Sequence, residues 1–164
     1  MKTHEEYMEL ALEEARKAEE IDEVPVGCVI ICDGEVISRG HNLKEQLNQA
    51  YAHAEMIAIQ KAAEVKGNWC LNDCDLYVTL EPCMMCTGII NLSRIRSVYY
   101  GTTDPKGGCL ETVIDLKKIN RLNHYPNIVG NILQKECAEI LTNYFRKKRE
   151  ITKEKKQKNK ANIQ

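Results

Sequence analysis

Two short segments of this chain carry side chains that could bind a metal ion and move protons. The first is His53-Ala54-Glu55 and the second is Pro82-Cys83-Met84-Met85-Cys86. One imidazole and two thiolates would fill three positions around a tetrahedral Zn2+, and an open fourth position distinguishes a catalytic zinc site from a structural one. A water in that position would have its pKa lowered from about 9 for aqueous zinc to roughly 7, which makes hydroxide available at neutral pH. The Glu55 carboxylate could then transfer protons.

The spacing of these residues is compatible with a single metal site. Cys83 and Cys86 are three positions apart, which places both on one face of the first turn of a helix. Pro82 favours a helix start at this point, and the free NH groups of a first turn favour thiolate over thiol. His53 and Glu55 would point in nearly opposite directions in the middle of a helix. We therefore expect His53 at the very start of a helix, where the backbone is not yet regular.

A Cys-x-x-Cys pair has other known roles. In an intracellular protein it can be a redox pair or one half of a four-cysteine zinc knuckle. Cys70 and Cys74 could supply the other half, since their separation falls within the broad spacing of zinc ligands. This alternative leaves His53-Ala54-Glu55 without a role. The other cysteines lie in apolar segments and are expected to pack as small hydrophobic side chains; they are Cys28, Cys32, Cys109 and Cys137.

The elements that would position these residues follow from the pattern of apolar and turn-forming residues. Thr3 and Glu6 form a capping box for an N-terminal helix. The segments 26–32 and 35–40 flank Asp33-Gly34, a dipeptide typical of two-residue hairpin turns. The remaining segments predict helices at 54–66, 83–92, 110–118 and 136 to about 153, and strands at 75–79, 97–101 and 128–132.

The order helix, hairpin and then alternating strand and helix predicts an α/β fold with three layers. We expect a central mixed sheet of five strands with helices on both faces. A chain of 164 residues, 43% of them hydrophobic, is large enough to bury the core of one domain. We predict a zinc-dependent catalytic domain over residues 1–152 and a basic, disordered tail over residues 153–164.

The cellular compartment can be predicted from what the sequence contains. No N-terminal stretch combines a basic start with an apolar run, and no run approaches the roughly 20 apolar residues that span a bilayer. Eight cysteines, of which at least two are expected as thiolates, fit a reducing compartment, and no disulfide is predicted. We therefore expect a cytoplasmic protein that does not contact a membrane.

The net charge of -1 conceals a strong asymmetry along the chain. Residues 146–160 carry nine basic and two acidic side chains, a net of +7, whereas residues 1–145 carry 14 basic and 22 acidic ones, a net of -8. A basic end on an acidic body is expected where a polyanion touches one edge of a protein. The cluster from Arg146 to Arg149 is the better contact candidate, because residues beyond about 152 are expected to form a solvated, frayed tail.

The sequence resembles the bacterial tRNA-specific adenosine deaminases over roughly residues 5–150. The pattern His-x-Glu followed by Pro-Cys-x-x-Cys is in itself a signature of the wider group of zinc nucleobase deaminases, and it implies a cytidine deaminase-like fold. The phrases that narrow the resemblance are Val24-Pro25-Val26-Gly27, Gly40-His41-Asn42, 76–83, Asn91-Leu92-Ser93-Arg94-Ile95, Glu136-Cys137 and Phe145-Arg146.

The resemblance implies hydrolytic conversion of adenosine to inosine at the wobble position, 34, of a tRNA anticodon, typically in an arginine tRNA. The family acts as a homodimer with one zinc per subunit. By match to its motifs, His53, Cys83 and Cys86 would hold the metal, Glu55 would move protons, and Asn42 would contact the target nucleoside. Further residues fall in segments that line the RNA path in this family: Asp104, Lys106, Asn123, Phe145, Arg146 and Arg149.

Four segments depart from the family pattern, namely residues 49–52, Cys70, 107–111 and 124–127. None contains the metal ligands, so they bear on the RNA surface.

Two other functions stay open. A deaminase of free guanine, cytosine or dCMP would use the same metal chemistry, and a non-catalytic zinc-containing module could bind RNA. Glu55 argues against the module, because a structural site has no use for an unligated carboxylate. The basic terminal helix argues against a small substrate.

Overall fold

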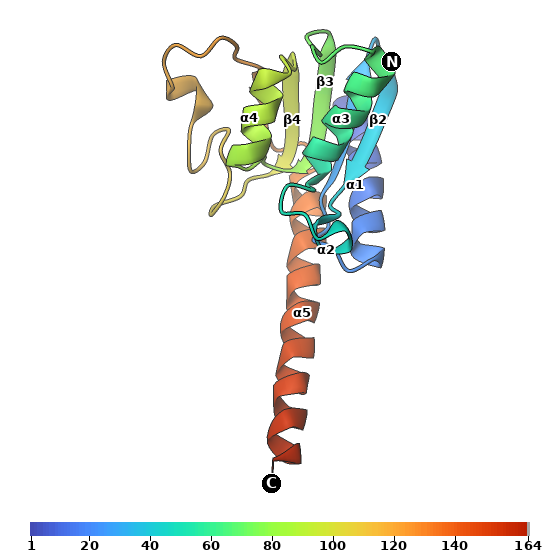
Figure 1. Cartoon of the computed structure of the whole chain (residues 1–164), viewed down its shortest axis with the longest axis vertical. Helices are drawn as coiled ribbons and strands as arrows, with labels where there is room; N and C mark the ends of the chain where they lie inside the picture. Colours follow the sequence, from blue (N-terminus) through green and yellow to red (C-terminus); the bar gives the residue numbers. More distant parts are fainter. Residues whose placement is uncertain (164) are drawn as a thin grey trace.

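In the computed structural model, which describes residues 1–163, five strands form one sheet between helices on its two faces (Figure 1). The sheet has the strand order β2-β1-β3-β4-β5. The strands are β1 Gly27–Cys32, β2 Glu35–His41, β3 Cys74–Leu80, β4 Ser97–Thr102 and β5 Asn127–Val129. The helices are α1 His4–Glu20, α2 Lys44–Leu47, α3 Ala54–Lys66, α4 Met84–Leu92 and α5 Gln134–Asn162, with one 3-10 turn, η1, at Leu116–Lys118.

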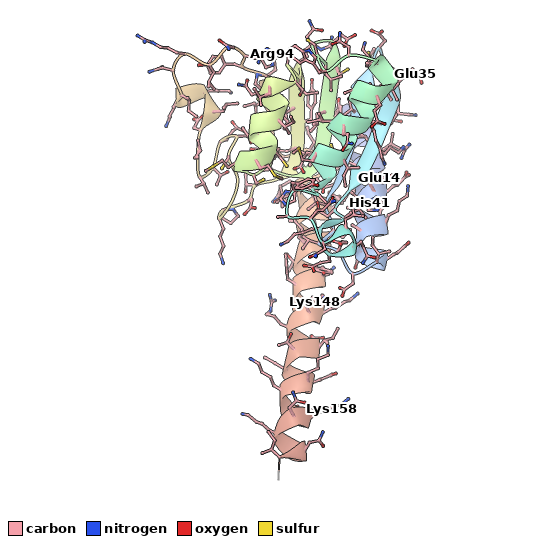
Figure 2. All side chains as sticks on the ribbon, in the orientation of Figure 1. Glu14, Glu35, His41, Arg94, Lys148 and Lys158 are labelled. Carbon is pink, nitrogen blue, oxygen red and sulfur yellow. The ribbon has the colours of Figure 1, made fainter. Side chains whose placement is uncertain are left out.

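The sheet is mixed, as predicted. β1 runs antiparallel to both β2 and β3, while β3, β4 and β5 run parallel to one another. β2, β3 and β4 therefore end at the same edge, which we call the carboxyl edge. The helices α3 and α4 follow β2 and β3 in the chain and begin there. Figure 2 shows His41, at the end of β2, and Arg94, after the end of α4, at opposite edges of the body.

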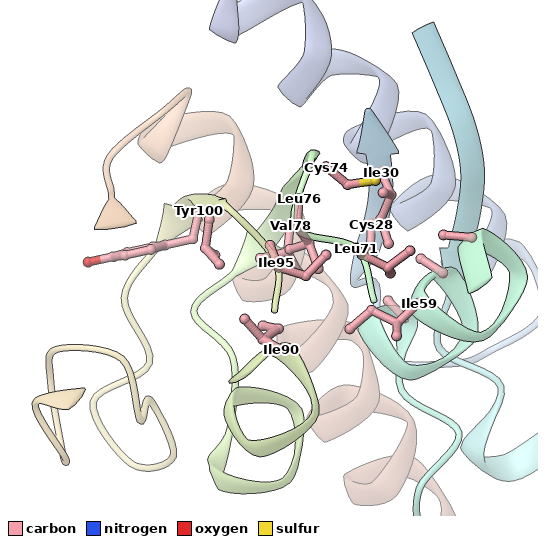
Figure 3. Close-up of a cluster of buried hydrophobic side chains, with 14 of the residues drawn as sticks. Cys28, Ile30, Ile59, Leu71, Cys74, Leu76, Val78, Ile90, Ile95 and Tyr100 are labelled. Carbon is pink, nitrogen blue, oxygen red and sulfur yellow. The ribbon is translucent and has the colours of Figure 1, made fainter. Parts of the chain in front are cut away.

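Alternate residues of the strands build a core on each face of the sheet, which confirms the three layers. Cys28 and Ile30 of β1 pack in the cluster formed with α3 and α4, part of which Figure 3 shows. Val29 and Ile31 pack on the opposite face, in the cluster formed with α1 and the start of α5. Because side chains alternate along a strand, a strand buried on both faces needs a continuous apolar sequence, as β1 has.

Gly40 lets the start of α3 lie directly against β2. A Cβ atom at Gly40 would come 2.5 Å from the backbone oxygen of Ala54, the first residue of α3. Any side chain at this position would push away the turn that follows His53. The glycine therefore fixes the position of one of the predicted ligands.

Local signals in the sequence agree with several element boundaries. Thr3 forms the predicted capping box with Glu6, and α3 covers the predicted 54–66 and ends at Gly67 in the left-handed region, with φ 62°. Asp33 and Gly34 have φ values of 50° and 81°, which is the hairpin turn that Asp-Gly favours.

Two weaker predictions are wrong. The expected helix at 110–118 is only the η1 turn, because the NH groups of Leu110, Glu111 and Thr112 point to the Glu81 carboxylate and are not available to a helix. The expected strand at 128–132 is shorter and lies at Asn127–Val129.

The last helix is longer than predicted. α5 continues to Asn162, past the expected end near Lys153, so the proposed boundary between residues 152 and 153 falls inside one helix. The segment expected to be disordered is helical as far as Asn162, and Gln164 lies outside the described residues. Residues 134–162 contain no glycine or proline and many lysine, glutamate and glutamine residues, which favour helix even without packing. Within residues 1–163, no helix is both long and apolar enough to cross a membrane.

Candidate metal centre

The three predicted metal ligands meet at the carboxyl edge. His53 is the N-cap residue of α3, with φ -86° and ψ 155°, and Cys83 is the N-cap residue of α4, with φ -75° and ψ 178°. Cys83 therefore precedes its helix, whereas Cys86 lies in the first turn. Because both cap residues are extended, their side chains are free of helical periodicity and can turn toward each other. The expectation that His53 stands at the very start of a helix is confirmed.

The distances between the donor atoms fit a zinc ion. His53 Nδ1 lies 3.6 Å from Cys83 Sγ and 3.6 Å from Cys86 Sγ, and all three donor atoms are within 4.8 Å of one another. Tetrahedral zinc with bonds of about 2.0–2.1 Å to nitrogen and about 2.3 Å to sulfur requires a nitrogen–sulfur separation of about 3.6 Å. The donor set and its spacing are thus those of a three-ligand zinc site.

The electrostatics of this cluster favour a thiolate. The hydrogen bond from the Cys86 thiol, aided by His53, outweighs burial and lowers the pKa of the Cys83 thiol to about 4. The hydrogen bond with Cys83 in turn raises the pKa of His53. Since a metal binds the thiolate and not the thiol, the cluster already holds one ligand in its binding form.

Glu55 supplies a buried carboxyl group beside these ligands. It lies in the first turn of α3 with only 4% of its surface exposed, and its Oε2 atom is 3.4 Å from Cys86 Sγ. Burial raises the pKa of the Glu55 carboxyl. A carboxyl group whose pKa is closer to neutrality can both accept a proton and return it during one reaction.

Glu81, just before Pro82, is a second buried carboxylate that the sequence analysis missed. It accepts hydrogen bonds from the backbone NH groups of Glu111 at 2.9 Å and Thr112 at 3.1 Å and from the Thr112 hydroxyl at 2.5 Å. A Cβ atom at Gly108 would come 2.4 Å from its carboxyl carbon. Glu81 thereby ties the loop after β4 to the strand end that carries Cys83. The sequence contained a signal for this role. Glu81 directly follows an apolar strand, and a carboxylate that is buried there must find hydrogen-bond partners.

Asn42 connects the metal ligands to a surface hollow. Its Oδ1 atom accepts a hydrogen bond of 2.9 Å from the NH group of Ala54, next to His53. Asn42 also lines a hollow of about 460 Å³, together with Asp22, Phe145 and Lys148. The structure thus brings together Asn42 and Phe145, two of the residues expected at the RNA path.

The remaining predicted RNA contacts lie in three places. Asp104 and Lys106 follow β4 at the carboxyl edge, where Asp104 Oδ1 accepts hydrogen bonds of 3.1 Å from the NH groups of Lys106 and Gly107. Arg146 and Arg149 are exposed on α5. Asn123 is not brought to the site within one chain.

Asn123 lies near the opposite edge of the sheet. The next residue, His124, bonds the backbone oxygen of Ile95 at 2.6 Å, and Asn127 pairs with Ser97 at the start of β4.

The four-cysteine knuckle is excluded, because Cys74 begins β3 and Cys83 follows its other end. Cys74 instead forms a second cluster with Cys32 and Asp73, whose donor atoms also lie within 4.8 Å of one another. Cys28, Cys109 and Cys137 are buried as predicted. Cys32 is buried too, but its sulfur contacts Asp73 and Lys66, which the apolar segment 26–31 before it did not indicate.

Comparison with known proteins agrees with this site. Residues 1–102 match the family model of the cytidine and deoxycytidylate deaminase zinc-binding region. The tRNA-specific adenosine deaminase of Bacillus subtilis (strain 168) is 47% identical over 150 residues, which cover 92% of this chain and 91% of the relative. That of Agrobacterium fabrum is 47% identical over 148 residues, which cover 90% of this chain and 96% of the relative.

Two solved structures extend the comparison. One, from studies of A-to-I editing by tRNA adenosine 34 deaminases, superposes with a TM-score of 0.80 at 47% identity and covers 83% of this chain and 99% of its own. The guanine deaminase of Bacillus subtilis superposes with a TM-score of 0.60 at 30% identity and covers 73% of this chain and 87% of its own.

Proposed function

The chain belongs to the tRNA-specific adenosine deaminases, within the zinc-dependent cytidine and deoxycytidylate deaminase family, and from this premise we propose its target nucleoside and the roles of its residues. It converts adenosine to inosine in tRNA with zinc as its cofactor. We propose that the target is adenosine 34, the wobble nucleoside of the anticodon, in an arginine tRNA. The observation that carries the proposal is that the predicted ligands, Glu55 and the hollow beside Phe145 share one edge of the sheet.

In this proposal, His53, Cys83 and Cys86 hold the zinc and Glu55 moves the protons. Bound zinc supplies the Lewis acidity that makes water a nucleophile at neutral pH. Glu55 accepts a proton from the attacking water, and the water oxygen adds to C6 of adenine. Glu55 delivers this proton to N1. It then takes the remaining proton from the hydroxyl group now on C6 and passes it to the amine, so that ammonia leaves and inosine remains. The buried setting of Glu55 protects these transfers from bulk water.

The target base must leave its stack before it can reach Glu55. Bases of a single-stranded loop are easier to turn out than bases of a duplex, which suits an anticodon loop. The Asn42 amide lies where it can contact the extruded nucleoside, and the half-exposed Phe145 ring offers a stacking surface for a neighbouring base. Asp104 and Lys106, in the loop tied to Glu81, face the same edge and are proposed to contact the loop backbone.

The experiment that tests this function compares substrates. Purified protein is incubated with a tRNA pool and, separately, with free guanine, cytosine and dCMP. Inosine is then located by nuclease digestion and mass spectrometry. We expect inosine at position 34 of arginine tRNA and no turnover of the small molecules. Efficient deamination of a free base without inosine in tRNA would support the small-molecule alternative instead, for which the similarity to a guanine deaminase is the specific observation.

We further propose that the enzyme works as a homodimer in the cytoplasm, where its tRNA substrate is found. Trp69 and Leu92, exposed at 65% and 64%, lie on the face covered by α3 and α4 and border an apolar groove of about 470 Å³. Tyr51, two residues before His53, lines the same groove. Large exposed apolar patches mark interaction surfaces, and a second copy would cover this one.

Dimer formation is tested by analytical ultracentrifugation of the double variant Trp69→Glu with Leu92→Glu. We expect a monomer, because two buried carboxylates would oppose the contact. Val129→Glu, which also places an acid at an exposed apolar position but on β5, is the matched control and should leave the dimer intact. A double variant that sediments as the wild type would place the interface on another face.

A further inference from the structure

The second half of α5 projects from the body as a free helix. Lys148 and Tyr144 both bond Asp22, and Lys148 does so at 2.5 Å. Past this point every side chain as far as Ile163 is exposed, and Figure 2 shows the helix passing Lys148 and continuing beyond Lys158. The helix leaves the body on the side where His41 marks the carboxyl edge (Figure 2). The projecting segment therefore starts beside the candidate metal centre.

Many of the basic side chains of this segment lie along one side of the helix. At about 100° per residue, five of them fall in a band about 80° wide along one side of the helix. We call this band the basic stripe; it consists of Arg146, Arg149, Lys153, Lys156 and Lys160. The two acidic residues, Glu150 and Glu154, lie outside it. From Arg146 to Lys160 the stripe is about 21 Å long.

The stripe begins at the hollow that contains Asn42. Phe145 lines that hollow and, on the same helical projection, lies at the border of the stripe, next to Arg149 and Lys156. An RNA loop held at the hollow would thus pass directly onto the stripe. The part of a tRNA that adjoins its anticodon loop is the anticodon stem.

The stripe is unfavourable for the isolated protein. Arg149 with Lys153, and Lys156 with Lys160, are like charges four residues apart, a spacing that destabilises a helix. The body over residues 1–145 has a net charge of -8, yet the helix projects away from it and does not pack along it. A row of closely spaced negative charges supplied by a partner would relieve this repulsion. A nucleic acid duplex has such a row, with about one phosphate per 1.7 Å in B-form DNA.

We propose that the lysine end of the basic stripe, Lys153, Lys156 and Lys160, binds the phosphates of the anticodon stem of the substrate tRNA. This proposal rests on the proposed function, since it assumes that the anticodon loop enters the hollow beside the metal centre. Lys153, Lys156 and Lys160 extend the contact of Arg146 and Arg149 from the loop onto the duplex. The stem is recognised through its backbone, so these lysines add affinity that does not depend on base sequence.

The test compares two triple variants that remove the same charge from the same helix. One carries Lys153→Gln, Lys156→Gln and Lys160→Gln on the stripe. The other carries Lys147→Gln, Lys155→Gln and Lys158→Gln, on the other side of the helix. Glutamine keeps the helix propensity close to that of lysine. Binding to the complete tRNA is measured as a function of salt concentration.

We expect the log-log salt slope of the stripe variant to be flatter by about 2–3, since each phosphate contact to a duplex contributes about 0.9. Its affinity at low salt should fall at least about tenfold. The control variant should change the slope by less than about 1 and keep its deamination rate. Wild-type protein should show the flatter slope with a hairpin that contains the loop but only a minimal stem.

Equal losses of tRNA affinity in the two variants would contradict the proposal, because any positive charge on the helix would then be enough for binding. An unchanged slope in the stripe variant would overturn it as well. Failure of the proposed function would look different: the wild type would form no inosine in tRNA, whatever the salt dependence of binding. A stripe-dependent slope without deamination would support the contact and contradict only the assigned reaction.

Discussion

Two clusters of metal-binding side chains lie at opposite edges of the same sheet, and they differ in how their charge is balanced. The first is His53, Cys83 and Cys86, and the second is Cys32, Asp73 and Cys74. In both, three donor atoms are within 4.8 Å of one another. Beside Cys32, Asp73 and Cys74 stands the Lys66 ammonium, 2.5 Å from Asp73 Oδ2 and 3.6 Å from Cys32 Sγ. That cluster already contains a cation. At the His53 cluster the neighbouring group is instead the Glu55 carboxyl.

The protonation states follow the same division. The hydrogen bond to Lys66 lowers the pKa of Asp73 to about 2, and burial raises the pKa of the Cys74 thiol well above its usual value. The second cluster is thus an ion pair beside a protonated thiol. In the first cluster, the pKa of Cys83 is lowered to about 4. Close donor atoms therefore do not by themselves make a metal site, because in the second cluster the Lys66 ammonium already balances the charge of the donor atoms.

The largest expected effect is loss of the metal from the first cluster alone. Combined replacement of His53, Cys83 and Cys86 by alanine should remove zinc and abolish deamination, because no ligand remains. The variant Cys32→Ser with Cys74→Ser should keep one zinc per chain and near-normal activity. Metal analysis by mass spectrometry and an inosine assay measure both. Stoichiometric zinc in the first variant, or its loss from the second, would reverse the comparison.

The next largest effect is expected from removing the Glu55 carboxyl group, which lies beside the first cluster. Glu55→Ala should reduce turnover by at least about 10²–10⁴-fold, since proton transfer to water and to the leaving amine is lost. Zinc content and tRNA affinity should be retained. Glu64→Ala, an exposed position on the same helix, is the control and should leave turnover unchanged. Near-normal inosine formation by Glu55→Ala would contradict the assigned role.

An intermediate effect is expected at Glu81, whose charge is balanced by NH groups and not by a metal or an ammonium. Burial raises its pKa, but the hydrogen bonds from Thr112 and the backbone outweigh this and lower it below 4.5. A lowered folded-state pKa stabilises the fold above about pH 4.5, and this contribution is lost as the pH falls through the folded value. Glu81→Gln should cost roughly 1–3 kcal/mol at pH 7.

Thermal unfolding between pH 7 and pH 3 checks this expectation. The wild type should lose more stability than Glu81→Gln over that range, so that the two curves converge in acid. Zinc affinity of the variant should also fall, because the strand end before Cys83 is no longer tied to the loop at 110–112. Parallel curves would show that the Glu81 charge does not stabilise the fold.

The smallest effect is expected when the cation of the second cluster, the Lys66 ammonium, is removed. Lys66→Met should leave turnover unchanged while allowing Cys32, Asp73 and Cys74 to bind a thiophilic ion such as Cd2+ weakly. Titration followed by the ultraviolet sulfur-to-metal band should show a second equivalent per chain in this variant. The further change Cys32→Ser should remove it. A second equivalent in the unmodified protein would mean that Lys66 does not occupy the cluster.

The sequence predicted the first cluster and not the second, for a physical reason. The zinc ligands lie in two compact motifs at helix starts. The end of α3 is also marked in the sequence, by Gly67. The second cluster depends on register: Cys32 pairs with Cys74 across β1 and β3, and Lys66 reaches Cys32 and Asp73 from the end of α3. Such contacts between distant segments are invisible to periodicity and capping rules.

The same limit explains the other errors. The loop at 110–118 looked helical because its composition is suitable, yet Glu81, which lies about thirty residues earlier, takes up its NH groups. The length of α5 was underestimated for a different reason. An amphipathic pattern ends near Lys153 and packing against the body ends near Lys148, but a lysine-rich sequence without glycine continues the helix.

β3 is third of the five strands in the described chain and lies in the middle of the sheet, which sets the order of events during synthesis. While the protein is being translated, β1 and β2 can form a hairpin alone, but His53 then has no partner. Cys83 and Cys86 emerge only after β3, and they meet His53 when β3 pairs with β1, whose residues lie more than forty positions earlier. Capture of the metal therefore waits until β3 and the start of α4 have been made, and chains that end before Cys83 cannot sequester zinc through this triad.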